Sequence, residues 1–503
     1  MNMGQFYTST DHFTIIPAVM LAMFGCAVLL FDCGVPLLFG PVFPDPRQRK
    51  WLLIFVVLAE IFTGFGLYSQ SAWLSGQGVA EVTGFQGSVT VDGFGIFFNW
   101  IFLIAALVVA LVSYKYLEIA GEHHGEYYGL ILFAQCGMYF LATGSDLITL
   151  FIGLELMALC FYVMVGFLRT EKRSNEAAIK YLLLGAFSTG FLVYGFSILY
   201  GIAGSTKLNE ITAAVSQRQV WDPVVFLAMA TTAIGLLFKI SAAPFHMWAP
   251  DAYEGAPTTV TAYLSVASKA ASIAFLLRIF AVQGPFALPS SREVWEPMMA
   301  AVAVLTLTLG NLAAINQTNI KRLLAYSSIS HAGYMLLGLV AGNDTGIKGI
   351  AVYVMVYTFM NLEAFLVIVA LRRQNIIGED LDDIAGLMQR SPGYAILMLI
   401  FLLSLAGIPP TAGFLGKYYI FLALLQTKHY GLAVVATLYV AVAIYYYFKI
   451  VRSMFAREPA EKTPMATTFG LRVALAVTGV LTLVIGIYPE PFLRFAQTTS
   501  LFH

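Results

Sequence analysis

The sequence predicts an all-α membrane protein with about fourteen transmembrane helices. Three observations support this class: 59% of the 503 residues are hydrophobic, only 11% are charged, and long apolar stretches follow one another along the whole chain. A typical soluble protein has roughly 25% charged residues, and a soluble protein this apolar would expose a large oily surface to water. Because about 20 apolar residues span a bilayer core, lipid is the expected solvent for this chain.

Hydropathy along the chain places the expected spans. Glycine, proline and charged residues fill the breaks between them, and no break is long enough for a soluble domain. A single polytopic domain over residues 1–503 is therefore expected. The spans run approximately over 13–33, 51–74, 94–114, 128–143, 146–168, 177–203, 224–245, 258–283, 298–316, 323–341, 349–371, 393–426, 431–454 and 470–488.

Basic residues are distributed unevenly between the two sides of this arrangement. When the loops are assigned alternately to the two sides, seventeen lysines and arginines fall on one side, seven on the other and four inside spans. Cytoplasmic loops are enriched in basic residues, so the first side is expected to be cytoplasmic, with both termini outside. The net charge of zero gives no reason to expect nucleic acid as a partner.

No residue pattern for metal or redox chemistry is found in the sequence. The four cysteines, Cys26, Cys33, Cys136 and Cys160, lie in apolar stretches without metal-ligand spacing, and we interpret them as small core residues. No strand followed by a Gly-x-Gly-x-x-Gly fingerprint indicates a dinucleotide site. The chain is therefore expected to hold neither a metal nor a redox cofactor.

Several ionisable residues lie inside the expected spans. They are Glu60, Glu155, Lys180, Lys239, Lys269, Glu363 and Lys417. A charge at the bilayer centre costs about 2.5–3.5 kcal/mol, so such side chains are expected to face one another, a polar cavity or water. Burial also lowers the pKa of a lysine toward neutrality, and such a lysine can accept and release a proton. Proton translocation is the function that this pattern favours.

These residues predict a route for protons near the middle of the membrane. Glu155 and Lys180 lie on consecutive helices and are expected to form an ion pair whose opening frees the lysine. Lys180 is also close enough to its helix end to extend toward the headgroups instead. Lys239, Lys269 and Lys417 are expected to carry protons laterally, with water between them.

Two histidines are further candidates for proton transfer. His331, in the tenth span, titrates near neutral pH and suits a relay, although a histidine in an apolar helix is also often only hydrogen-bonded to a neighbour. His246 lies where the seventh span is interrupted and is a candidate for a cytoplasmic entrance.

Prolines interrupt two of the spans that carry a buried lysine. Pro244 follows Lys239 in the seventh span, and Pro409 and Pro410 precede Lys417 in the twelfth. Proline removes an amide donor from a helix, and the freed carbonyls at membrane depth need polar partners or water. Paired broken helices indicate an ion path in transporters. A proline kink that serves only packing is the alternative for either break taken alone.

Three segments resemble those of the antiporter-like membrane subunits of respiratory complex I, the proton-pumping NADH:quinone oxidoreductase. They are KISAAPFHMWAPDAYEGAP (Lys239 to Pro257), SVASKAAS around Lys269, and NIKRLLAYSSISHAGYM around His331. The resemblance covers nearly the whole chain and is closest to the N-type subunits. Lys417 stands where an M-type relative is expected to have glutamate, and the stretch of about fifteen residues after the last span is short for the long lateral helix expected of the L-type.

The resemblance implies fourteen helices with two inverted five-helix repeats, helices 4–8 and 9–13, in which helices 7 and 12 are broken. It divides the chain into N-terminal helices 1–3 (1–127), a first repeat (128–283), a second repeat (298–454) and a last helix (470–488). The residues that look like the family's relay on helices 5, 6, 7, 8, 10 and 12 are Glu155, Lys180, Lys239, Lys269, His331 and Lys417.

The resemblance also implies partners. It places NADH, FMN, iron–sulfur clusters and quinone in other membrane and peripheral subunits of complex I, in a bacterial plasma membrane rather than an organelle. Glu363 stands where relatives are expected to have a small residue, and it either pairs with a central lysine or faces a polar pocket. A subunit of a cation/proton antiporter or membrane-bound hydrogenase is the alternative function. A passive subunit whose buried charges only organise helix packing is the third.

Overall fold

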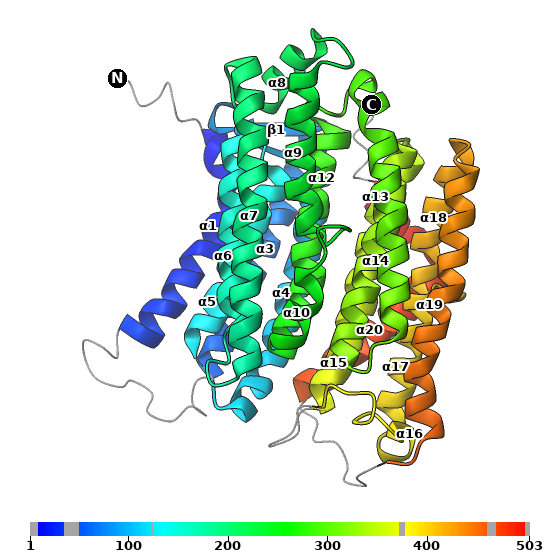
Figure 1. Ribbon diagram of the computed structural model, residues 1–503. Helices are drawn as coiled ribbons and strands as arrows, with labels where there is room; N and C mark the ends of the chain where they lie inside the picture. The colour runs from blue at the N-terminus through cyan, green and yellow to red at the C-terminus, as the bar shows by residue number, and fades with distance from the viewer. Residues whose placement is uncertain (1–8, 35–49, 123, 372–377, 460–468, 498–503) are drawn as a thin grey trace.

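The structure is a computed structural model that describes residues 9–34, 50–122, 124–371, 378–459 and 469–497. Its helices run side by side along the long direction of the molecule (Figure 1). Eleven helices of the described residues are long and apolar enough to cross a membrane, so the predicted all-α membrane class is confirmed. Five basic residues used for the orientation, together with the Cys33 side chain, lie outside the described part: Arg47, Arg49, Arg372, Arg373 and Lys462.

The N-terminal part of the chain contains three long helices and a short hairpin. Asp92 begins the third helix by accepting a hydrogen bond from the Gly95 amide at 2.7 Å, and Gly121 ends it with a φ of 74°. The elements are α1 (Ser9–Leu29), the π-helical turn η2 (Leu30–Gly34), α3 (Lys50–Gln77), β1 (Glu81–Gly84), the 3-10 turn η4 (Phe85–Gly87), antiparallel β2 (Val89–Asp92) and α4 (Gly93–Ala120).

The middle of the chain contains the helices around the first break. Asp146 and Asp222 cap two of them, and the amide of Val224 lowers the pKa of the Asp222 carboxyl by hydrogen bonding to it. The elements are α5 (Gly125–Thr143), α6 (Leu147–Val165), α7 (Lys172–Ala203), α8 (Leu208–Ser216), α9 (Pro223–Lys239), α10 (Trp248–Gly255), α11 (Thr258–Tyr263), η5 (Leu264–Ser268), α12 (Lys269–Leu277) and η6 (Arg278–Val282), in which η5 and η6 are π-helical turns.

The last part of the chain contains the helices around the second break. Asn319 starts one of them by accepting a hydrogen bond from the Arg322 amide at 3.0 Å. The elements are α13 (Pro289–Ile315), α14 (Ile320–Ala341), α15 (Asp344–Leu371), α16 (Leu387–Arg390), α17 (Pro392–Ala406), α18 (Ala412–Gln426), α19 (Tyr430–Ala456), α20 (Phe469–Ile487) and α21 (Glu490–Gln497).

Two predicted crossings are interrupted where the prolines occur. The first stops at the end of α9 and resumes at α10, and the second stops at the end of α17 and resumes at α18. Each break contains a cis peptide bond, Ala243–Pro244 or Pro409–Pro410. Together with α5, these interrupted crossings account for the predicted spans that are not among the eleven long apolar helices. The expected breaks in the seventh and twelfth spans are confirmed.

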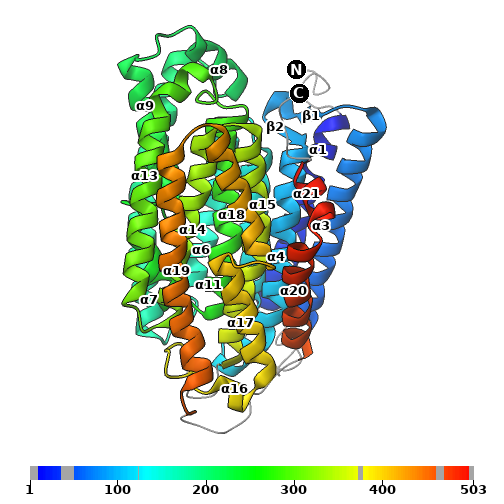
Figure 2. The same cartoon turned by 90° about the vertical axis from the view of Figure 1, so that its right-hand side faces the viewer.

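Helices α14 and α15 occupy the centre of the bundle, and almost all of their residues are buried. Helix α20 packs against α15 and α4, so the last long helix contacts the N-terminal part (Figure 2). Outer helices expose large apolar side chains, such as Ile61 and Phe65 on α3 and Phe187 on α7. An apolar outer surface of this kind suits lipid, and the buried centre is where polar side chains need partners.

Candidate functional site

Lys239 is the last residue of α9 and is 4% exposed. Its Nζ donates a hydrogen bond to the Tyr162 hydroxyl at 3.3 Å and lies 5.7 Å from the centre of that ring. Tyr162 lies on α6, and Glu155 precedes it on the same helix by about two turns. The Glu155 carboxylate acts electrostatically on Lys239. Helix α6 therefore brings both a phenol and an acid toward the lysine at the first break.

The predicted ion pair between Glu155 and Lys180 is wrong for the described structure. Lys180 Nζ lies 2.7 Å from Glu176 Oε1 and 3.0 Å from Asp251 Oδ2, and the lysine side chain is 47% exposed. Glu155 Oε1 instead accepts a hydrogen bond from the Thr189 hydroxyl at 2.9 Å. Lys180 lies near the start of α7, where a long side chain reaches the charged helix end.

Lys180 belongs to a network of alternating charges at the end of the bundle where basic residues gather. Arg322 Nη1 lies 2.9 Å from both Asp251 Oδ1 and Glu254 Oε2, and Lys180 binds the other oxygen of Asp251. A pocket of about 250 Å³ is lined by these groups. The structure thus places Lys180 beside a surface pocket and not with the buried lysines Lys239, Lys269 and Lys417, which are called the lysine row below.

Lys269 begins α12, directly after the π-helical turn η5, and is 2% exposed. Its Nζ donates to the Ser328 carbonyl at 2.7 Å and to the Ser328 hydroxyl. The same hydroxyl oxygen accepts a hydrogen bond from Tyr357 at 2.8 Å and lies 3.4 Å from the Tyr253 hydroxyl. Lys269 is therefore connected to α14, across the boundary between the two halves of the chain.

His331 follows Ser328 by about one turn of α14 and is 2% exposed. Its Nδ1 lies 2.6 Å from the Tyr353 hydroxyl, and its Nε2 lies 3.1 Å from the Tyr447 hydroxyl. Phenolic hydroxyls can donate and accept hydrogen bonds. Both ring nitrogens of His331 are thus in contact with groups that can exchange a proton.

Lys417 lies in α18, just after the second break, and is 3% exposed. Its Nζ donates to the carbonyls of Ala406 at 2.7 Å and Leu405 at 3.2 Å, which are among the last carbonyls of α17. It also lies 5.1 Å from the centre of the Tyr334 ring. Because the end of a helix leaves carbonyls without an intrahelical partner, the break itself provides the lysine with acceptors.

Helix α14 joins these sites. Ser328, His331 and Tyr334 recur every third residue and lie on one side of the helix. Ser328 contacts Lys269, and Tyr334 contacts Lys417. The positive charges of both lysines also act on His331. The structure therefore brings Lys269, His331 and Lys417 together along α14, while Lys239 lies with α6.

Glu363 pairs with no lysine in the part of the chain that the structure describes. Its two carboxylate oxygens each lie 2.9 Å from the Thr482 hydroxyl of α20, and the glutamate is fully buried. The expectation of a polar pocket is the one that the structure supports. His246 lies half-buried in the first break, against the backbone of Pro244, and takes part in none of the ion pairs of the described residues.

We expect the Thr482→Val variant to lose about 1–3 kcal/mol of stability, because it removes the hydroxyl that contacts both oxygens of the buried Glu363 carboxyl and leaves Thr478 as the hydroxyl partner. Thermal unfolding of the purified assembly measures this loss. The matched control is Thr437→Val, because the Thr437 hydroxyl bonds only to the Ala433 carbonyl of its own helix among the described residues. Equal unfolding temperatures for the two variants would contradict the assigned contact.

Two buried ion pairs were not predicted, and both correct the assignment of loop charges. Arg278 donates to both carboxylate oxygens of Asp92 at 2.7 and 2.8 Å, and both side chains are fully buried. Lys321 Nζ lies 2.8 Å from Glu379 Oε1 and is 1% exposed. The count of basic residues by side includes Lys321 on the basic side and Arg278 on the other, although Arg278 falls within the expected span 258–283. Their positions near span ends were the only signal, because the partners are far away in sequence.

Among the described residues, no group of three or more His, Cys, Asp or Glu side chains is placed to hold a metal ion. Cys136 and Cys160 are buried, whereas Cys26 is exposed on the outer surface. The two buried cysteines agree with the interpretation of small core residues. The chemistry that the site itself offers is the binding and transfer of protons by amines, phenols, an imidazole and carboxylates.

The NADH:quinone oxidoreductase/Mrp antiporter transmembrane family matches residues 144–443, which include Glu155, Lys239, Lys269, His331 and Lys417. The chain belongs to this family. The resemblance inferred from the three sequence segments is therefore confirmed.

Relatives within the NADH:quinone oxidoreductase/Mrp antiporter family cover the chain almost completely. NADH-quinone oxidoreductase subunit N 2 of Solibacter usitatus is 81% identical, with 99% of each chain covered. Subunit N 1 of Koribacter versatilis is 51% identical, with 97% of this chain and 95% of the relative covered. A chain of respiratory complex I from Thermus thermophilus is 31% identical, with a TM-score of 0.77 and coverage of 95% and 98%.

Proposed function

We propose that this chain is the N-type membrane subunit of a bacterial NADH:quinone oxidoreductase and that it translocates protons across the plasma membrane. Identity to subunit N proteins over nearly the full length supports the assignment. The observation that carries the mechanism is the connection along α14 between Lys269 and Lys417, with His331 between them. Buried ionisable groups in membrane proteins mark ion pathways.

Protons enter the row, on this proposal, at Lys239. The amine accepts a proton and holds it against the Tyr162 hydroxyl, and the negative charge of Glu155 stabilises the protonated form. The proton then moves to Lys269, which shares it with the Ser328 hydroxyl. Lys180, Asp251 and the pocket beside them provide a solvated approach from the basic end.

His331 couples the two lysines of the second part of the row. A positive charge on Lys269 or Lys417 repels a proton from the imidazole. When one lysine releases its proton, His331 accepts a proton through Tyr353 or Tyr447 and passes it on. Because the positive charges of these sites repel one another, binding of a proton at one site favours release of the proton from the neighbouring site.

The redox chemistry belongs, on this proposal, to partner subunits. NADH, FMN, iron–sulfur clusters and quinone are assigned to them, and this chain responds to quinone reduction through changes in charge or conformation passed along the membrane arm. Copurification of the chain with NADH-oxidising subunits is the expected result, and copurification only with subunits of a cation/proton antiporter would contradict it.

The Lys269→Met variant of the complete complex tests the function directly. Methionine keeps the length of the side chain and removes the proton-binding amine. We expect NADH-driven acidification of proteoliposomes to fall at least about tenfold, because a positioned proton-transfer group contributes roughly 10²–10⁴-fold. NADH oxidation by an artificial acceptor is expected to stay unchanged.

Lys115→Met is the matched control for this experiment, because Lys115 is 46% exposed and pairs with Glu118 on the surface. The control is expected to translocate the same number of protons per NADH as the unmodified complex. A Lys269→Met complex that assembles and also keeps this number would overturn the proposed function.

A further inference from the structure

Glu60 is a buried acid that the lysine row does not use. It lies on α3, is 2% exposed, and accepts a hydrogen bond from Gln135 Nε2 of α5 at 3.0 Å through Oε2. Its other oxygen, Oε1, is buried and has no hydrogen-bond partner among the described residues. A carboxylate with one oxygen that accepts no hydrogen bond can bind a proton or a water molecule at that oxygen.

More buried oxygens without partners lie near Glu60 on the same two helices. Thr63 Oγ1, Gln70 Oε1 and Gln135 Oε1 have no hydrogen-bond partner within the described part of the chain, and each residue is at most 2% exposed. Glu60, Thr63 and Gln70 share one face of α3 and span about 15 Å along it. Because buried polar atoms are normally paired, this stripe of oxygens is a feature that packing alone does not explain.

Hydrogen bonds continue the stripe toward the hairpin. Gln70 Nε2 donates to the Tyr139 hydroxyl at 3.1 Å and to the Phe13 carbonyl at 2.9 Å. Tyr139 donates in turn to the Thr14 carbonyl at 2.5 Å. The Thr14 hydroxyl then donates to the Asp11 carbonyl at 2.9 Å. Hydrogen bonds thus connect Gln70 of α3 and Tyr139 of α5 to the first turns of α1.

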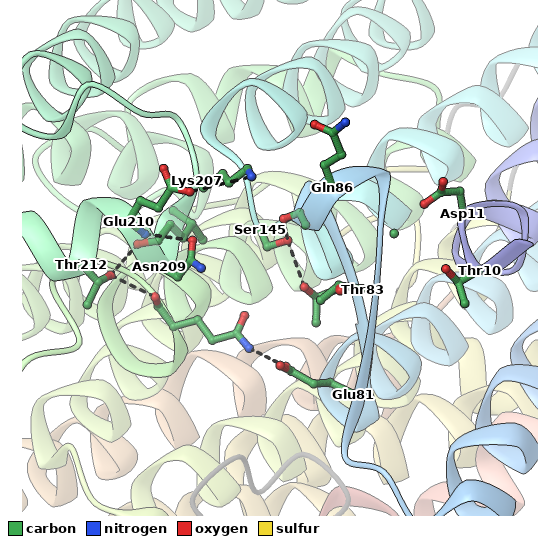
Figure 3. Close-up of a pocket in the computed structure, with 15 residues that line it drawn as sticks. Thr10, Asp11, Glu81, Thr83, Gln86, Ser145, Lys207, Asn209, Glu210 and Thr212 are labelled. Atoms are coloured by element: carbon green, nitrogen blue, oxygen red, sulfur yellow. Dashed lines mark hydrogen bonds and ion pairs between the residues drawn. The ribbon is translucent and has the colours of Figure 1, made fainter. Parts of the chain in front are cut away.

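Asp11 lines a pocket of about 700 Å³ (Figure 3). Residues of the hairpin and of α8 line the pocket. Both elements lie at the end of the bundle opposite α16 (Figure 1). Glu81 and Glu210, which also line it, are exposed, so the pocket opens to the surface. This end carries few of the basic residues and is the non-cytoplasmic end by the positive-inside rule.

The Glu60 end of the stripe is linked to the helical run that carries Lys269. Glu60 acts electrostatically on Tyr263, which lies less than two turns before Lys269 on the continuous run from α11 to α12. Tyr263 in turn donates a hydrogen bond to the Ile131 carbonyl of α5 at 3.3 Å. Glu60 therefore acts on a residue of the same helical run that carries Lys269.

We infer that Glu60 is a proton-binding site on an exit route from the lysine row, along α3 and α5, to the non-cytoplasmic pocket that Asp11 lines. The Glu60 carboxylate takes up a proton from the row and returns to its charged form when the proton passes to the next oxygen of the stripe. The Thr63 and Tyr139 hydroxyls, with water hydrogen-bonded to the unpaired amide oxygens, carry the proton onward to the pocket. This inference rests on the proposed function.

The Glu60→Gln variant in the complete, reconstituted complex tests the route. Glutamine keeps the shape of the side chain and the contact with Gln135, but its amide does not bind a proton near neutral pH. We expect NADH-driven acidification to slow about tenfold or more, while NADH oxidation by an artificial acceptor is unchanged. The infrared absorption of a buried protonated carboxyl that changes during turnover is expected to disappear, and Glu60→Asp is expected to restore both readouts in part.

Matched variants make each outcome decisive. Glu118→Gln, at the surface end of α4, is expected to behave like the unmodified complex. If Glu60→Gln fails to assemble, Thr63→Val and Tyr139→Phe remove only hydroxyl groups and carry the test. If Glu60→Gln, or both hydroxyl variants, pump protons normally, the exit route is overturned. If Lys269→Met does not pump in the same assay, the proposed function still stands. Normal pumping by Lys269→Met overturns the proposed function itself.

Discussion

Replacing Lys239 with methionine is expected to reduce proton translocation by the assembled complex at least about tenfold, because proton transfer by a positioned group contributes roughly 10²–10⁴-fold. Lys239 ends α9 at the first break, and its amine contacts the Tyr162 hydroxyl. Glu155 provides a negative charge nearby. Methionine fills the same space but binds no proton, so the row loses its first site while its packing is retained.

The measurement is the number of protons translocated per NADH oxidised in proteoliposomes, together with the amount of assembled complex. Tyr162→Phe, which removes only the hydroxyl, is expected to give a smaller loss than Lys239→Met. Lys115→Met is expected to change neither quantity. A passive subunit whose charges only organise packing predicts the opposite result: Lys239→Met would lower the amount of complex and leave the protons per NADH unchanged.

Replacing Arg278 with methionine is expected to destabilise the subunit by about 3–5 kcal/mol, because it leaves a charged, buried partner uncompensated. Arg278 binds both oxygens of Asp92 and also donates twice to the Ala142 carbonyl. Its guanidinium lies 4.7 Å from the centre of the Phe94 ring. The substitution removes the link from the start of η6 to the start of α4, through Asp92, and to the end of α5, through Ala142. The unfolding temperature of the purified complex and its yield in membranes measure the effect.

Asp92→Asn in the Arg278→Met background is the informative second variant. Asparagine removes the unpaired charge and still caps α4, so most of the lost stability is expected to return. Arg457→Met is the matched surface control, because Arg457 and Asp382 form an exposed pair, and such pairs contribute only about 0–1 kcal/mol. A loss for Arg278→Met no larger than that of Arg457→Met would show that the buried pair does not hold these helices together.

The long apolar stretches predicted the membrane class, and the prolines predicted both breaks. Hydropathy and the loss of an amide donor are properties of a short stretch of chain, so they act in the same way wherever the helix finally packs. The burial of Lys239, Lys269 and Lys417 was also predictable, because each lies deep in an apolar run and a charge there needs a polar environment.

The partners of these residues were not predictable in the same way. Lys180 binds Asp251 rather than Glu155, Glu363 faces Thr482 rather than a lysine, and Arg278 binds Asp92 from the far N-terminal part. Each outcome depends on how far one helix is rotated against another, and a rotation of one residue turns a side chain through about 100°. Hydropathy does not determine this rotation.

The amino-acid pattern alone established which helices cross the membrane, where two of them break and which amines are buried in them, because those properties follow from the local cost of placing polar groups in lipid. The arrangement of Ser328, His331 and Tyr334 between two lysines, and of Glu60 at the inner end of a polar stripe, came only from the packed bundle. Side chains distant in sequence meet when helices dock, and the contacts across many helices together decide which of them meet.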